Sequence, residues 1–139
     1  MVLRSTVATG DIEKSEKITI NLGPVDLGQI DLLVAEGFYA NRTDFIRSAI
    51  RAQIATRAAA VDQTVARRTL TLGTMTLTRP ELEELAQAGR TVEIRVLGLA
   101  TIAPDVTPEL ALATISVVEV LGAFRASPAV KAALAPRTV

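Results

Sequence analysis

Three polar side chains at alternate positions, Lys17, Thr19 and Asn21, are the residues of this chain best suited to recognising a ligand. Lysine can donate to guanine O6 or N7, asparagine can form two hydrogen bonds with adenine, and threonine offers a hydroxyl and a methyl group. Residues at i, i+2 and i+4 of an extended strand lie on one face. The spacing therefore predicts a polar row that could read the edges of DNA bases.

The segment that carries this row alternates, because Ile18, Ile20 and Leu22 occupy the positions between the polar residues. Such alternation, with β-branched residues, predicts a strand over 17–22. A lone strand of this length has unpaired backbone edges and needs a partner. The simplest partner is the same strand of a second chain, antiparallel about a two-fold axis. The ribbon would present the polar row twice, on a platform narrow enough for the major groove. Taken alone, the row could equally be the solvated side of an ordinary strand.

Two helices are predicted after the strand. Apolar residues recur at helical spacing from Val25 to Glu36, and Gly37 is suited to ending that helix. Asn41 can cap a second helix, with Asp44 placed to reach back in a capping-box-like arrangement. The alanine-rich residues that follow predict an extension of the second helix to Arg68. We expect the apolar faces to form a dimer core of Ile18, Ile20, Leu22, Ile30, Leu33, Phe45, Ile46, Ala49 and Ile50.

The order strand, Gly-Pro, helix, glycine turn and second helix, with the run Asn41-Arg42-Thr43-Asp44-Phe45-Ile46-Arg47-Ser48-Ala49-Ile50-Arg51, resembles the ribbon-helix-helix family of the CopG, Arc and MetJ kind. The resemblance covers about Lys17 to Ile54. It implies that the three alternate polar residues read bases, and that backbone amides at the start of the second helix bind a DNA phosphate. A helix N-terminus independently favours phosphate. The implied phosphate-binding residues are Asn41, Arg42 and Thr43.

Charge supports a nucleic-acid partner for the first half only. Lys plus Arg equals Asp plus Glu, at 15 each, so the total charge is uninformative. Residues 41–68 contain six arginines and two aspartates, whereas the chain from Thr69 onward has six basic and seven acidic residues. We therefore expect any DNA-binding surface in the first half.

The composition argues against an enzyme. Cysteine and histidine are absent, which removes disulfides, thiolate sites and the commonest metal ligand and general base. The best carboxylate pair, Glu83 and Glu84, has no visible nucleophile or base beside it. We expect no catalytic residue, metal or cofactor. The sequence also lacks a signal-peptide pattern or a long apolar run, which predicts a cytoplasmic, nucleoid-associated protein without a membrane partner.

The second half repeats itself. Val96-Leu97-Gly98 matches Val120-Leu121-Gly122 at an offset of 24 residues, and Pro104 then matches Pro128. Leu72-Gly73 followed by Pro80 is a looser third copy. Each unit predicts a strand through the Leu-Gly pair, a turn opened by proline and a short helix. The units are loosely similar to leucine-rich or β-solenoid repeats.

The predicted fold class is α+β: an N-terminal ribbon-helix-helix with an intertwined dimeric antiparallel ribbon, then a small solenoid-like β/α repeat domain. The predicted segments are a flexible arm at 1–16, a DNA-binding domain at 17–54, a helical extension at 55–68 and three units of about 24 residues at 69–139. We expect a sequence-specific double-stranded DNA-binding repressor acting as a dimer or higher oligomer, with a possible protein partner for 69–139. Two alternatives are an antitoxin whose second half binds a toxin, and a scaffold that assembles through its repeats.

Overall fold

The computed structural model describes residues 15–139, which form two compact units that divide between residues 63 and 64. We call residues 15–63 the head and residues 64–139 the repeat unit. The predicted arm at 1–16 lies almost entirely outside the described residues.

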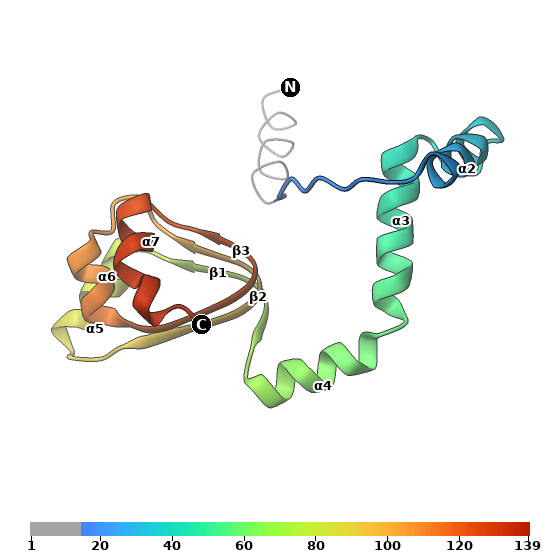
Figure 1. Ribbon diagram of the computed structural model, residues 1–139. Helices are drawn as coiled ribbons and strands as arrows, with labels where there is room; N and C mark the ends of the chain where they lie inside the picture. Colours follow the sequence, from blue (N-terminus) through green and yellow to red (C-terminus); the bar gives the residue numbers. More distant parts are fainter. Residues whose placement is uncertain (1–14) are drawn as a thin grey trace, which may run out of the picture. The chain divides into compact units, whose positions relative to one another are not determined.

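The helices α2 (Pro24–Ala35) and α3 (Arg42–Ala55) lie in the head and follow a chain segment without regular secondary structure (Figure 1). Pro24 stands in the first turn of α2, where its missing N–H costs no hydrogen bond. Gly37, at φ +85°, ends the helix. The amide of Phe38 then donates to the carbonyl of Leu33, and that of Gly37 to Val34, which is the hydrogen-bond pattern of a Schellman cap. The predicted helix from Val25 to Glu36 is confirmed.

The predicted continuous helix to Arg68 is wrong, because the chain breaks at Thr56 and Arg57. The helix α3 ends at Ala55, and a separate helix, α4, spans Ala58–Arg68. The hydroxyl of Thr56 donates to the carbonyl of Gln53 over 2.7 Å, so the side chain offers the backbone an alternative to the helical ladder. Alanine content alone did not reveal this local competition.

The repeat unit is a three-stranded parallel sheet in the order β1-β2-β3, so the predicted mixture of helix and strand is confirmed. Its strands are β1 (Thr71–Leu77), β2 (Val92–Ile102) and β3 (Ile115–Arg125). Each strand is followed by a helix, and these helices lie along one side of the sheet (Figure 1). They are α5 (Arg79–Gln87), α6 (Pro108–Thr114) and α7 (Pro128–Leu134), and a 3₁₀ turn, η1 (Ala135–Arg137), ends the series.

The sheet register aligns the residues that the sequence repeat aligns. Gly73 pairs with Gly98, and Gly98 pairs with Gly122. All three have positive φ, at 125°, 141° and 124°. A Cβ on Gly98 would lie closer than 3.0 Å to the carbonyl oxygen of Gly73, and one on Gly122 equally close to the carbonyl of Gly98. All three positions therefore need glycine for their backbone conformation, and Gly98 and Gly122 need it also for the close approach of the preceding strand.

The predicted equivalence of Pro104 and Pro128 is wrong, since α6 begins at Pro108. Thr107 caps this helix by accepting a hydrogen bond from the amide of Leu110 over 3.2 Å, as Ser127 caps α7. Pro104 lies in the turn before that cap. The middle unit therefore has a longer connection between strand and helix than its neighbours. Stacking of the units as a solenoid stays a prediction.

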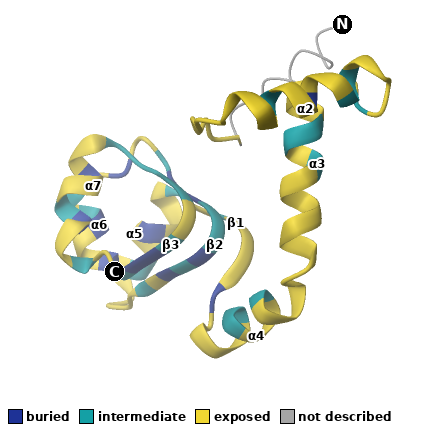
Figure 2. Cartoon of the chain, turned by 45° about the vertical axis from the view of Figure 1, so that its right-hand side comes forward, coloured by how far each residue is buried: buried dark blue, intermediate teal, exposed yellow. Residues whose placement is uncertain are grey.

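The hydrophobic core lies between the sheet and its helices (Figure 2). Its fully buried large side chains are Leu82, Ile94, Val96, Ile115, Val118, Val130 and Leu134. Among the described residues of the head, by contrast, only Ile30 is buried. The repeat unit thus has a core of its own, and the head does not.

One carboxylate is buried in the sheet. Glu119, 5% exposed, accepts a hydrogen bond from Arg95 over 2.7 Å and forms a second ion pair with Arg68. A carboxylate so removed from water needs such partners. The pairs join the end of α4 to β2 and β3.

Candidate nucleic-acid interface

Lys17, Thr19 and Asn21 lie on the extended segment before α2, and all three are exposed. The apolar residues between them are also exposed: Ile18 at 75%, Ile20 at 56% and Leu22 at 41%. Within the described chain, residues 17–22 pair with no strand. The segment thus has polar and apolar positions in the predicted alternation, but the ribbon itself stays a prediction because it needs a second chain.

The start of α3 is held by side chains on both sides of the helix boundary. Asn41 has an extended backbone, and its Oδ1 accepts a hydrogen bond from the amide of Asp44 over 2.8 Å. Asp44 in turn accepts from the amide of Ala40 over 2.9 Å. The predicted cap is confirmed. The carboxylate reaches one residue further back than a capping box requires, to Ala40 rather than to Asn41.

Arg42 is not a free cation. Its Nε and Nη2 donate to the two carboxylate oxygens of Asp31 over 2.7 and 2.8 Å, which joins α2 to α3. The hydrogen bond from Arg42 lowers the pKa of Asp31, and the same bond raises the pKa of Arg42. Asp31 could not be identified from the sequence, because nothing in it marks a partner eleven residues away across a turn. Its effect is to fix where the Arg42 side chain points.

Two backbone amides remain available at this helix start. The first amides of a helix have no acceptor within it, and Asn41 satisfies only that of Asp44. Those of Arg42 and Thr43 find no side-chain acceptor among the described residues, and Thr43 is exposed. With the positive end of the helix dipole, such amides suit an anion.

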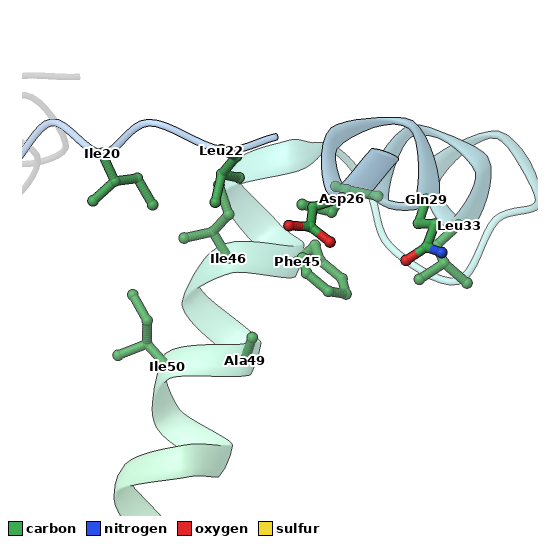
Figure 3. Close-up of a pocket in the computed structure, with 10 residues that line it drawn as sticks. Ile20, Leu22, Asp26, Gln29, Leu33, Phe45, Ile46, Ala49 and Ile50 are labelled. Atoms are coloured by element: carbon green, nitrogen blue, oxygen red, sulfur yellow. The ribbon is translucent and has the colours of Figure 1, made fainter. Parts of the chain in front are cut away.

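An open apolar groove of about 380 Å³ lies between the extended segment, α2 and α3 (Figure 3). Figure 3 shows Ile20 and Leu22 from the extended segment beside Ile46 and Ile50 from α3. The structure thus brings together eight of the nine residues predicted for the dimer core, namely Ile20, Leu22, Ile30, Leu33, Phe45, Ile46, Ala49 and Ile50. Ile18 is not among the groove residues. Tyr39 supports the groove wall by an edge-to-face contact with Phe45, with ring centroids 5.0 Å apart.

No group of three or more acidic side chains could hold a metal ion in residues 15–139. Over the same residues, no helix is both long and apolar enough to cross a membrane.

Comparison with known proteins identifies the family. The model of the ribbon-helix-helix transcriptional regulator family matches residues 13–131. The match extends well beyond 17–54, where the sequence resemblance ended, and includes most of the repeat unit. No curated protein and no solved structure matches the chain significantly. Families of this kind are generally regulators and not enzymes. The chain belongs to the ribbon-helix-helix transcriptional regulator family.

Proposed function

We propose that this chain is a sequence-specific double-stranded DNA-binding repressor, and that its DNA-binding unit is a dimer of heads. The observation that carries the proposal is the open groove, which gathers eight apolar residues in a head with one buried side chain. So little burial cannot balance the entropy of ordering the head. A second head is the partner that the family and the groove both support.

The dimer would form through the extended segments. Residues 17–22 of two chains would pair antiparallel, which satisfies the backbone edges and turns Ile18, Ile20 and Leu22 toward the paired grooves. Full burial of a side chain of this size stabilises by roughly 1.5–3 kcal/mol. These three residues, exposed in one chain, would contribute from both chains of the dimer.

Base recognition would then come from the outer face of the ribbon. Lys17, Thr19 and Asn21 of both chains would lie in the major groove, which a two-stranded ribbon can enter. Among them, Asn21 suits adenine, since its amide can donate and accept at the same base. Its contribution is expected to be sequence preference more than total affinity.

Phosphate contacts would fix the ribbon in the groove. The amides of Arg42 and Thr43 can bind a phosphate at the start of α3, while Asn41 holds that helix start in place. Such contacts carry much of the affinity and weaken as salt rises. By occupying its operator on chromosomal DNA, in the cytoplasm, the dimer would repress transcription.

Selection of bound genomic fragments tests the base-reading role, with wild type compared to Asn21→Ala. We expect the substitution to abolish the preferred motif while the dimer stays folded, and an unchanged motif would refute the assignment. Arg42→Ala keeps the backbone amide but removes a positive charge beside the phosphate site, and should instead weaken binding to all fragments alike. Asp31→Ala is its matched control, because it breaks the same ion pair and leaves the arginine.

Sedimentation of Ile20→Asp tests the dimer. Ile20 is 56% exposed in the single chain, so the charge costs little there but would be buried in the ribbon. The expected result is loss of head pairing and of DNA binding together. Leu32→Asp, at an exposed α2 position outside the groove, is the control and should retain both.

A further inference from the structure

The two edges of the repeat sheet differ. The first edge strand, β1, runs Thr-Leu-Gly-Thr-Met-Thr-Leu and has no charged residue and no proline. Natural sheets usually protect an open edge with lysine, proline or a bulge. Most of β1 is exposed, and Leu72 reaches 67%. The strand β1 itself therefore has none of these three protections.

Among the described residues, the chain end pairs with the opposite edge, along β3, at the beginning of that strand. Thr138 bridges Val118, and the amide of Val139 donates to the carbonyl of Val118 over 2.8 Å. Beyond that point, no described strand pairs with the outer edge of β3. Through the register, Thr71 lies level with Val96 and thus with Val120. Six of the seven residues of β1, 71–76, thus lie level with residues 120–125 of β3.

The glycine row gives these edges complementary shapes. At Gly98 and at Gly122, the space of a Cβ holds the carbonyl oxygen of the glycine on the preceding strand. At Gly73, which has the same kind of backbone at φ +125°, that space is empty within 4 Å. The carbonyls of Gly73 and Gly98 each point toward the following strand, so we expect the equivalent carbonyl of Gly122 to point outward from the edge of β3. One edge thus offers the carbonyl that the other edge has room to receive.

The flanking helices have opposite charge. The helix beside β1, α5, carries three glutamates and one arginine. The helix after β3, α7, carries Lys131 and no acidic residue. In the chain, α5 packs on α6 and α6 on α7, so a next unit would place its α5 beside this α7. The charges favour that neighbour over a second α5.

From these observations we propose that repeat units of separate chains join head to tail. The β1 strand of one copy pairs in parallel with residues 120–125 of β3 of another, with Gly73 against Gly122. The contact joins two different edges, so each copy retains one edge for a further copy, and the assembly grows into a ring or a filament. The contact does not depend on the head.

Engineered cysteines test the register directly, because the chain has no cysteine of its own. Leu72→Cys and Leu121→Cys are combined in the full chain. Within one chain these positions flank Leu97 and lie two strand spacings apart, about 9–10 Å, which is beyond the reach of a disulfide. Between copies they would be direct neighbours. Mild oxidation should give a ladder of covalent dimers, trimers and larger species.

Thr76→Cys with Leu121→Cys is the matched control, since Thr76 lies on the same edge but about 13 Å out of register. The control should give at most traces of the ladder. Equal cross-linking of the two variants, or none in either, would overturn the proposal.

Charge substitution gives a second test by sedimentation velocity. Leu72→Glu with Leu121→Glu places like charges opposite each other between copies and should remove the larger assemblies. Leu72→Lys with Leu121→Glu places opposite charges there and should retain them. Leu112→Glu, at an exposed leucine of α6 away from both edges, should behave as wild type. The same mass for all three variants would refute the contact.

These results are separable from the dimer of heads. When the edge contact is removed by like charges, heads that pair leave a dimer, and heads that do not pair leave a monomer. The covalent ladder reports on the sheet edges in either case.

Discussion

Replacing Gly98 with alanine tests whether the glycine row holds the strands together. Gly98 and Gly73 both have φ in the range that L side chains rarely adopt, at 141° and 125°. A methyl group at Gly98 would overlap the backbone carbonyl of Gly73, whereas one at Gly73 would meet nothing within 4 Å. Both substitutions therefore force an alanine into an unfavourable backbone conformation, but only Gly98→Ala also creates an overlap with a neighbouring strand.

The loss of unfolding free energy can be estimated for each of the two substitutions. An alanine held at such a φ costs about 1–3 kcal/mol at either site. Overlap with a backbone atom cannot be relieved by rotating a side chain, so the strands must separate, which adds about 1–3 kcal/mol as in an overpacked core. Gly98→Ala should therefore lose about 1–3 kcal/mol more unfolding free energy than Gly73→Ala.

Urea unfolding followed by far-ultraviolet circular dichroism measures the difference, at a concentration too low for assembly to contribute. Fluorescence of Tyr39, the single tyrosine of the chain, reports on the head and should be the same in both variants. Gly28→Ala, in α2 with open space around it, is a control that should be neutral or stabilising. A Gly98→Ala protein no less stable than Gly73→Ala would refute the close-approach argument.

Three further substitutions probe separate contacts. Asn41→Ala should cost the head about 1 kcal/mol through loss of its cap, and an unchanged thermal midpoint would contradict this role. Glu119→Gln should cost the repeat unit about 1.5–3 kcal/mol in urea unfolding, because a buried carboxylate loses charged hydrogen bonds to two arginines. Asp31→Asn should destabilise the head slightly at neutral pH. The lowered pKa of Asp31 means that its pairing with Arg42 contributes above the ordinary value of 3.8 and is lost as the pH falls through the lowered pKa, so thermal melts of variant and wild type should converge in strong acid.

Local signals in the sequence predicted the helices of the head well. Gly37 ends α2 because only a residue that accepts positive φ completes the Schellman cap, and that requirement is visible in the sequence. The break after Ala55 was not visible, since Thr56 is a single hydroxyl within an alanine-rich run. The helix propensity of the whole run is dominated by its alanines, whereas the break depends on one hydrogen bond from the Thr56 hydroxyl to the carbonyl of Gln53.

The repeats could be predicted because identical residues on successive parallel strands lie side by side. An offset of 24 residues in the sequence thus became the register of Gly98 with Gly122. The start of α6 could not be predicted from the repeat offset. Pro104 and Pro108 are both compatible with a helix start, and the choice depends on the capping hydroxyl of Thr107.

The candidate site was predictable residue by residue but not as a set of contacts. Alternation over 17–22 identifies which residues share a face, yet the strand partner belongs to another molecule. The pairing of Arg42 with Asp31 is tertiary, because it joins two helices across a turn whose path the sequence does not specify. The periodicity of a sequence shows which face of a strand or helix a residue lies on. Which residue it contacts depends on the tertiary packing.

The common register of the three strands also bears on how the chain can change in length. Each strand presents the same glycine level to the next, so the edge that remains after removing or duplicating a whole unit is equivalent to the original edge. Insertion of one residue within β2 would instead shift its glycine past both neighbours and turn its side chains to the other face. Length differences among relatives should therefore occur as whole units of about 24 residues or in connections such as 103–107, and not inside the strands.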